Sequence, residues 1–500
     1  MRPALPVTAG TPLLKAHRRH IRPILSNVPS VFVKRPWLLA ALAIGGLALG
    51  VRLVRLFVHP NIPDEAFTIY TGALPLARLF EMLRANDAHP PLIYLIVHGL
   101  LYVSRRAYAF RLVPVIFATV GTVATYLLGR RFLDRFAWFP AVLVALCPLL
   151  VFFDQYVRMY ALLWSLGILG WLTLFWALDE PAKKIRWAAY GTVSLLLVYS
   201  HYLSFFMIAA QLAYVAVNRP RTAGFWAAIA CVGLGFSPWI PTLVAQVPNG
   251  GLAFTAVRHG AAMLWNLPAV LLIDGISANI EANFVVVGAL WLLIIGGAIG
   301  AAARKPVILW LLLPVGLQLG YSLASGKALM VARYLLQAIP VLGIMIALAV
   351  ESLALTRLRL LSIAVPLSLI VLMLQGVADK LFVASYQPVD WAAYGRFLHA
   401  HIKPQDAVVF DGGMTYFVVQ GAAPMLGHQV MLVTNAKVAK GVAHDVSSLS
   451  RIWYVEYAVD LSDPQRSVSA SLRRSHRLHH SWRSAPASAG EVVYTTLFER

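Results

Sequence analysis

The fold is decided first by residues 36–58, which read PWLLAALAIGGLALGVRLVRLFV. This stretch has no acidic residue, and it is long enough for a helix to cross the roughly 30 Å hydrocarbon core of a bilayer. The preceding segment, 1–35, is basic and also has no acidic residue. Because positive charge flanks a first span on its cytoplasmic side, we expect a cytoplasmic tail followed by a first membrane helix.

The composition of the whole chain agrees with that first stretch. Of the 500 residues, 59% are hydrophobic and 13% are charged, and the mean hydropathy is +0.71. Soluble domains average about 45–50% apolar and about 25% charged residues, and a single soluble core stops growing at roughly 250–300 residues. Lipid must therefore cover much of this chain, and we predict a mainly α fold built as a polytopic membrane helix bundle.

The net charge of +21 does not indicate nucleic-acid binding. The Lys and Arg residues form short clusters between apolar runs, which is where the positive-inside rule places them in membrane proteins. The two cysteines, Cys147 and Cys231, both lie inside apolar runs, so the sequence offers neither a disulfide framework nor a cysteine metal site.

About eleven stretches are candidates to cross the membrane, with end errors of a few residues. They are 36–58, 110–129, 136–153, 160–178, 187–200, 203–217, 223–244, 284–303, 306–323, 335–355 and 360–377. Residues 92–103 are apolar too, but stretches of about 10–14 residues are more often interfacial or re-entrant. We expect that segment to lie on the outer surface.

Alternate loops carry the basic residues, which tests the orientation. These inside residues are Arg130, Arg131, Arg135, Lys183, Lys184, Arg186, Arg219, Arg221, Arg304, Lys305, Arg357 and Arg359. Every one fits a cytoplasmic N-terminus. An odd number of crossings then places the C-terminus outside, and we expect a multi-pass protein of the bacterial inner (plasma) membrane with a periplasmic C-terminal domain.

Two parts outside the bundle stand out. In a large outer loop, 59–108, Leu76, Leu79, Phe80 and Leu83 recur with helical spacing opposite charged residues, which predicts an amphipathic helix at the membrane interface. After about residue 380 charged residues return, with strand-like runs at 407–410, 430–433, 452–455 and 492–497. The expected domains are therefore 1–35, 36–380 and a small α/β domain, 381–500.

The first acids of the chain, Asp64 and Glu65, are adjacent and follow the first span directly. Partly desolvated carboxylates at a membrane surface suit general-base work or cation binding, but Asp64 after a proline also fits a helix N-cap. In the same loop, His89 precedes two prolines and an apolar helix. A lone His at such a position serves either as a hydrogen-bonding cap or as a site residue.

Two later outer segments carry cations at helix ends. Arg158 lies in Asp-Gln-Tyr-Val-Arg-Met-Tyr, residues 154–160, and could meet a phosphate or simply snorkel to the interface. Lys327 with Arg333 and Tyr334 forms the second group, for which interfacial anchoring by basic and aromatic residues is the alternative.

Taken in order, these segments resemble a known family. The chain contains Asp-Glu-Ala (64–66), His-Pro-Pro (89–91), Ala-x-Arg-Leu (109–112), Gly-Arg-Arg (129–131), Arg-Met-Tyr (158–160) and Arg-Tyr (333–334). In this order it resembles the GT-C glycosyltransferases, specifically the bacterial relatives of protein O-mannosyltransferases and aminoarabinose (lipid A) transferases. The resemblance covers roughly 36–391 and is strongest up to about residue 170.

The resemblance implies a lipid-linked donor, a polyprenyl-phosphate sugar, and an inverting transfer in one step on the outer face. It implies that Asp64 is the general base, with Glu65 beside it. It assigns substrate binding to His89, Arg158, Tyr160, Lys327, Arg333 and Tyr334. The three cations among them would neutralise the departing lipid phosphate.

The chain departs from the family at its second outer loop. Relatives often read Gln-Glu-x-Arg-Met-Tyr, whereas here Tyr156 takes the place of the acid and Asp154 comes two residues earlier. This departure argues against divalent-metal binding by a second-loop carboxylate. We therefore assign no metal ligand and no cofactor, and metal dependence stays an open alternative.

The expected partners are the donor, membrane lipids and an acceptor that is a glycan, a lipid or a protein, without nucleic acid. Two alternatives stay open: a polytopic transporter or flippase of lipid-linked sugars, and a non-catalytic assembly subunit. Transporters usually place ionisable residues near the bilayer midplane and often contain inverted repeats. Here the acids cluster at outer helix ends and no repeat is visible.

Overall fold

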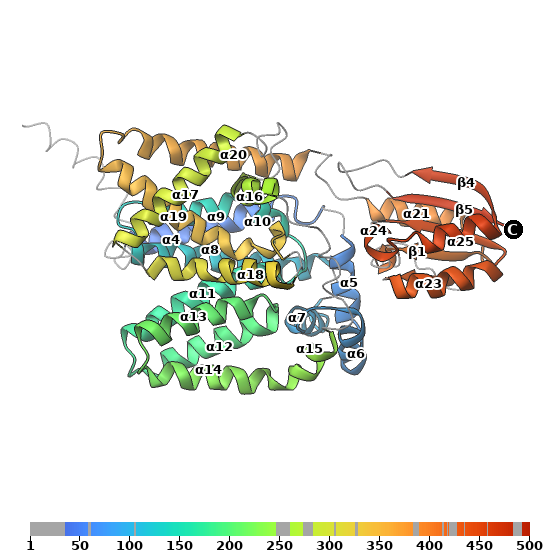
Figure 1. Cartoon of the computed structure of the whole chain (residues 1–500), viewed down its shortest axis with the longest axis horizontal. Coiled ribbons are helices and arrows are strands. Elements are labelled where there is room, and N and C mark those ends of the chain that lie inside the picture. The colour runs from blue at the N-terminus through green and yellow to red at the C-terminus, as the bar shows by residue number, and fades with distance from the viewer. Residues whose placement is uncertain are drawn as a thin grey trace, which may run out of the picture.

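The structure is a computed structural model in which a helical bundle carries a smaller sheet domain at one end (Figure 1). It describes residues 36–58, 62–104, 107–246, 261–273, 284–304, 307–325, 329–383, 390–412, 415–417, 419, 428–434, 436–457, 459–483 and 493–500.

The bundle is built from helices whose bounds, apart from those of α16, follow the predicted spans closely. They are α4 (Pro36–Leu53), α8 (Ala107–Phe132), α9 (Phe139–Leu146), α10 (Pro148–Phe153), α11 (Tyr160–Asp179), α12 (Lys184–Ser200), α13 (Ser204–Asn218), α14 (Ala223–Phe236), α15 (Ile240–Gln246), α16 (Ala261–Ile273), α17 (Phe284–Arg304), α18 (Val307–Ser325), α19 (Ile339–Ala354) and α20 (Leu361–Phe382). Short 3-10 turns are η1 (Ser237–Trp239), η4 (Ala332–Tyr334) and η5 (Leu336–Ala338).

Within the described residues, 7 helices are long and apolar enough to cross a membrane, and each coincides with a predicted span. The other predicted spans are helical as well, although 136–153 divides into α9 and α10 where Pro148 follows Cys147. Helix α16 was not predicted, because its apolar run is short and contains Pro268. The chain is a multi-pass membrane protein, while the number of crossings and the orientation stay predictions.

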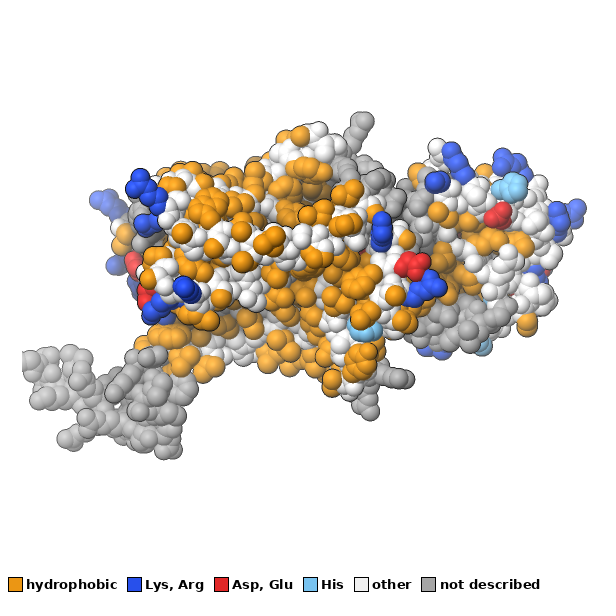
Figure 2. Space-filling view, turned by 90° about the horizontal axis from the view of Figure 1, so that it is seen from below, with side chains coloured by type: hydrophobic (Ala, Val, Ile, Leu, Met, Phe, Trp, Pro, Cys, Tyr) orange, Lys and Arg blue, Asp and Glu red, His pale blue; other side chains and the backbone are white. Residues whose placement is uncertain are grey.

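The bundle packs around α11, which is buried along most of its length. Helix α8 approaches α11 closely at Gly121, where a Cβ atom would lie 2.7 Å from the Cβ of Ser165. Helices α4, α17 and α20 instead leave large aliphatic side chains exposed, among them Leu42, Leu292 and Leu367. Figure 2 shows the resulting surface: hydrophobic side chains dominate the middle of the bundle, and Lys and Arg gather at its ends.

The outer loop folds into three short helices: α5 (Pro63–Gly72), α6 (Leu76–Asn86) and α7 (Leu92–Leu100). The predicted amphipathic helix is α6, but only Leu79 and Leu83 are buried, whereas Leu76 and Phe80 are exposed. Helix α7 has 9 residues, which is too short to span, and packs against α5. All three lie at the end of the bundle that faces the sheet (Figure 1).

The C-terminal part is a small α/β domain with a mixed sheet. Its elements are α21 (Trp391–His401), β1 (Ala407–Asp411), β2 (Gln429–Val433), α23 (Ala436–Asp445), η6 (Val446–Ser448), β3 (Arg451–Glu456), α24 (Val459–Ser462), α25 (Ser467–Ser475), β4 (Arg477–Arg483) and β5 (Tyr494–Glu499). The strand order is β2-β1-β3-β5-β4, with β1 parallel to β2 and β3, and β5 antiparallel to β3 and β4. Strand β4 was not predicted, because its side chains are mostly exposed and polar.

Aromatic side chains join the sheet domain to the bundle through α5. Phe417, beyond the end of β1, lies 5.1 Å from the ring of Phe67 and 5.0 Å from that of Tyr70. Ala66 belongs to the same hydrophobic cluster as Trp391 and Phe410 of the sheet domain. Helix α5 therefore touches the sheet domain with one face while its first turn carries the two adjacent acids.

Candidate functional site

In helix α5 the side chains of Asp64 and Glu65 have different surroundings, although the two residues are neighbours in the chain. Pro63 occupies the first turn, where its fixed φ and missing N–H cost nothing. The N-cap is Ile62 and no side chain caps the helix, so Asp64 does not have the capping role that was the alternative to a catalytic one. The side chain of Asp64 is 36% exposed, and that of Glu65 is fully buried.

Glu65 is held on both carboxylate oxygens. Arg111 donates from Nε to Oε1 at 2.8 Å and from Nη2 to Oε2 at 2.6 Å, and the backbone N–H of Val157 donates to Oε1 at 3.1 Å. Arg111 also donates to the carbonyl of Leu56 at 2.9 Å. The pair thus ties the first span, α5, α8 and the second outer loop together beneath the exposed acid.

Asp64 faces Arg158, which is buried. The Arg158 Nε atom lies 3.9 Å from Asp64 Oδ2, and Nη1 donates to Thr68 Oγ1 at 3.0 Å and to Tyr94 Oη at 3.3 Å. Within the part of the chain that the structure describes, Nε has no hydrogen-bond partner. A buried cationic N–H without an acceptor is costly, so this group is poised to receive an anionic ligand.

His89 joins the same network through Asp87. Its Nδ1 donates to Asp87 Oδ1 at 2.7 Å, and the Tyr94 hydroxyl donates to Asp87 Oδ2. Burial raises the pKa of Asp87, but the charge and hydrogen bond of His89, together with Arg158, outweigh burial and leave that pKa below its ordinary value. Asp87 therefore stays ionised and holds both His89 and Tyr94, of which Tyr94 accepts from Arg158.

A second cation approaches Asp64 from η4. Arg333 lies with its guanidinium carbon 5.3 Å from the ring centre of Tyr334, and it interacts electrostatically with Asp64 and Tyr160. Its Nε has no hydrogen-bond partner among the described residues. Gln318 Nε2 donates to the Tyr334 carbonyl at 3.2 Å and so anchors the turn. Lys327, the third predicted cation, lies outside the described residues.

Asp154 takes no part in this site. Arg52 donates to its Oδ2 at 2.9 Å and Trp164 donates to its Oδ1 at 2.9 Å, and all three side chains are buried. The second outer loop therefore uses its acid to hold the first span. Across the described residues, no group of three or more His, Cys, Asp or Glu could hold a metal ion.

The structure brings six of the eight predicted site residues together in one place. Asp64, His89, Arg158, Tyr160, Arg333 and Tyr334 meet there, Glu65 lies behind them, and Lys327 is not described. Asp87, Tyr94 and His201 were missed as site residues. Asp87 two residues before His89 was an available signal, but no local motif marks Tyr94 or His201.

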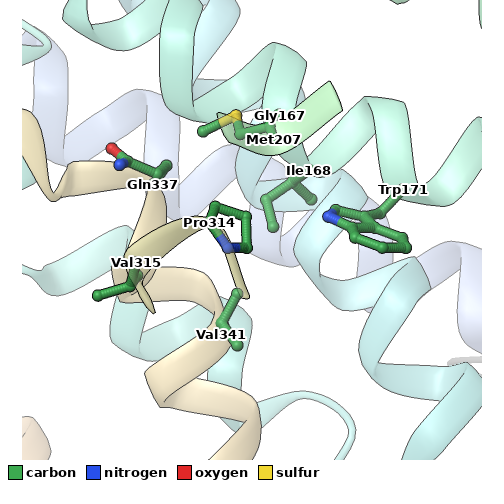
Figure 3. Close-up of a pocket in the computed structure, with 8 residues that line it drawn as sticks. All are labelled: Gly167, Ile168, Trp171, Met207, Pro314, Val315, Gln337 and Val341. Carbon is green, nitrogen blue, oxygen red and sulfur yellow. The ribbon is translucent and has the colours of Figure 1, made fainter. Parts of the chain in front are cut away.

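A separate apolar cavity lies inside the bundle, between α11, α13, α18 and α19. Figure 3 shows its lining, to which Trp171, Met207 and Pro314 contribute together with Gln337, the single amide side chain among the eight residues drawn. Gln337 donates to Gln318 Oε1 at 3.0 Å. The cavity therefore borders the amide pair that anchors η4, and its other lining residues are mostly apolar.

Comparisons with known proteins identify the fold. No protein-family model and no curated protein matches the chain. ArnT from Cupriavidus metallidurans in the apo state superposes with a TM-score of 0.53 and 14% identity over 93% of this chain and 98% of ArnT. The chain has the GT-C fold.

A second solved structure supports the same fold assignment. The archaeal oligosaccharyltransferase AglB from Archaeoglobus fulgidus, in complex with an inhibitory peptide and a dolichol-phosphate, gives a TM-score of 0.55 with 12% identity. The match covers 92% of this chain and 74% of AglB. The predicted fold class, a mainly α GT-C-like membrane bundle with a small C-terminal α/β domain, is thereby confirmed. At such identity the likeness concerns the fold alone.

Proposed function

We propose that this protein is a membrane glycosyltransferase that moves a sugar from a polyprenyl-phosphate donor to an acceptor hydroxyl on the outer face. One observation carries the proposal. A half-exposed carboxylate, Asp64, lies 3.9 Å from the buried guanidinium of Arg158, and Arg333 interacts with the same carboxylate. Transfer from a lipid phosphate needs a base for the acceptor and cations for the leaving group, and these residues supply both.

Asp64 is the base because it is the accessible acid of the pair. Its carboxylate reaches the surface at the N-terminal end of α5, whereas both oxygens of Glu65 are occupied by Arg111 and Val157. Glu65 is accordingly a positioning residue that fixes α5 against α8. His89, oriented by Asp87, binds substrate beside this carboxylate.

Arg158 and Arg333 receive the phosphate. Both are largely buried, and each keeps an Nε–H without a hydrogen-bond partner among the described residues. Charge-assisted contacts from guanidinium to phosphate are strong and directional. Tyr160 and Tyr334 flank these cations, and Lys327 is added to the set by the family resemblance alone.

The reaction then proceeds in one displacement with inversion. Asp64 accepts the proton of the acceptor hydroxyl, while the oxygen of that hydroxyl forms a bond to the anomeric carbon of the sugar. The bond from that carbon to the phosphate oxygen breaks, and the phosphate leaves with the electron pair as polyprenyl phosphate. Arg158 and Arg333 stabilise the charge that grows on this oxygen. The bonds, the proton and the electron pair of this step balance without a metal ion.

The donor class has support from one relative in fold, since the AglB structure was determined with a dolichol-phosphate. We further propose that the chain lies in a bacterial inner membrane with its N-terminus in the cytoplasm and its site and sheet domain outside. The basic loops predict this arrangement. In a variant with Cys231 replaced by Ser, a cysteine at Ser467 should react with an impermeant reagent in intact cells, and one at Ala182 should not. Labelling of Ala182 alone would reverse the orientation.

A turnover assay separates the enzyme from its alternatives. The purified protein in detergent, given undecaprenyl-phosphate sugars and candidate acceptors, should release undecaprenyl phosphate in step with the glycosylated product. A flippase would instead move the intact donor across proteoliposomes without breaking the sugar bond. A non-catalytic subunit would do neither, so movement without cleavage, or no reaction with any donor, would contradict the proposal.

A further inference from the structure

His201 lies in the turn between α12 and α13 and is not used by the mechanism above. Its side chain is almost completely buried, and its ring packs edge-on against His89 at 5.0 Å between centres. The rings of Tyr334 and Tyr160 lie at 5.8 Å and 6.3 Å. A residue from a helix pair remote in sequence thus contacts site residues from the outer loop, α11 and η4.

The position of its proton is fixed by the backbone. The N–H of Leu203 donates to His201 Nδ1 at 3.1 Å, so this nitrogen is the acceptor. Burial, together with the charges of His89, Arg158 and Arg333, holds the pKa of His201 well below its ordinary value, so the ring is neutral at physiological pH. A neutral ring with Nδ1 as acceptor carries its hydrogen on Nε2.

That Nε2–H has no partner in the part of the chain that the structure describes. Leaving a buried donor unsatisfied is costly, and few such groups persist without a reason. Two further N–H donors, Nε of Arg158 and Nε of Arg333, also lack a hydrogen-bond partner among the described residues, and they belong to residues whose charges act on this ring. Three unsatisfied donors on residues that interact electrostatically, two of them positively charged, suit an oxyanion.

We propose that the Nε2–H of His201 donates a hydrogen bond to a phosphate oxygen of the lipid donor, together with Arg158 and Arg333. This inference rests on the proposed function, and it adds a neutral third donor to the phosphate site. A neutral donor contributes direction without adding charge. The bound phosphate thereby has a fixed orientation relative to Asp64.

Two substitutions separate this role from a structural one. Asparagine at position 201 offers an oxygen near the position of Nδ1, which keeps the acceptor for Leu203 but removes the Nε2 donor. Glutamine is longer and places an N–H near the position of Nε2 instead. The measurement is the affinity of purified full-length protein in detergent for undecaprenyl phosphate, with undecaprenol as the uncharged lipid control and thermal melting as the check on folding.

His201→Asn should bind undecaprenyl phosphate roughly 10- to 100-fold more weakly, as for the loss of one hydrogen bond to a charged group, while binding undecaprenol as wild type does. His201→Gln should retain most of the phosphate preference, and His401→Asn on the exposed face of α21 should change nothing. If His201→Asn kept the phosphate preference and His201→Gln lost it, the residue would serve only to hold the turn through Leu203. Equal phosphate preference in the two variants would also overturn the inference. A wild-type protein with no preference for the phosphate would instead contradict the proposed donor class.

Discussion

Two arginine–carboxylate pairs lie within one turn of α5, and they differ in what remains open. In the Glu65–Arg111 pair both carboxylate oxygens and the guanidinium are hydrogen-bonded inside the protein. In the Asp64–Arg158 pair the guanidinium comes no closer than 3.9 Å to the carboxylate, although it donates to the Asp64 carbonyl at 3.4 Å. The carboxylate is 36% exposed, and Arg158 Nε has no hydrogen-bond partner among the described residues. The first pair is closed and the second is open to a ligand.

The difference shows how adjacent acids can serve two purposes. Successive residues of a helix point about 100° apart, because the helix has about 3.6 residues per turn. Glu65 consequently points into the bundle, while Asp64 points along its outer end. The buried pair holds the backbone of α5 in place. The Asp64 carboxylate therefore keeps a fixed position although it makes few contacts of its own.

The largest expected effect comes from breaking the open pair at its acid. Asp64→Asn should reduce turnover by about 10²–10⁴-fold, the usual contribution of a general base, because the amide cannot accept the acceptor's proton. The melting temperature should hardly change, since Asp64 neither caps α5 nor is buried. The measurement is turnover with an undecaprenyl-phosphate sugar at matched amounts of folded protein. Near-normal activity would show that Asp64 is not the base.

Breaking the closed pair should change stability rather than chemistry. Glu65→Gln removes the charge that balances buried Arg111, and loss of one partner of a buried pair costs about 3–5 kcal/mol. Thermal melting in detergent should therefore fall well below wild type, whereas turnover per folded molecule should fall far less than in Asp64→Asn.

A double variant sharpens that test. Adding Arg111→Gln to Glu65→Gln removes the stranded charge, so the two losses should combine to less than their sum, as contacting residues do in double-mutant cycles. A stable Glu65→Gln protein that is as inactive as Asp64→Asn would show that the closed pair belongs to the chemistry.

The sequence predicted the fold better than the site, and the reason is physical. An apolar run long enough to span is a local property, so α4, α8, α11, α17, α19 and α20 could be read from hydropathy. Helix α16 and strand β4 were missed because one is short and the other is polar and exposed. Fold class depends on many residues at once and tolerates such errors.

The site depends on which distant residues meet. Asp64 and Arg158 were singled out by their motifs, but only the structure shows that Glu65 is closed by Arg111, or that Asp154 is taken by Arg52. His201 illustrates the limit most clearly. Its surroundings come from the outer loop, α11 and η4, and nothing in Ser-His-Tyr indicates them.

The two cations near Asp64, which are Arg158 of the open pair and Arg333, should show a smaller effect than the acid. Arg158→Ala or Arg333→Ala should weaken use of the donor by about 10- to 100-fold, the loss expected for hydrogen bonds to a charged group. Lysine at either position should do less harm, because it keeps the charge while losing the planar fork. The measurement is kcat/KM for the lipid-linked sugar, with Arg219→Ala in an exposed loop as control. If both alanine variants keep wild-type kinetics, neither arginine binds phosphate.

The smallest expected effect belongs to an ion pair whose hydrogen-bond distances are as short as those of the closed pair. Arg131 donates to both oxygens of Asp179 at 2.7 Å and 2.6 Å, yet the two side chains are 39% and 45% exposed. Water screens such pairs, and their contribution is typically about 0–1 kcal/mol. Arg131→Gln should therefore lower the melting temperature only slightly and leave turnover unchanged, in contrast to Glu65→Gln. A loss of stability as large as that of Glu65→Gln would mean that burial is not what distinguishes the closed pair, and that its contacts with Leu56 and Val157 would have to explain its role instead.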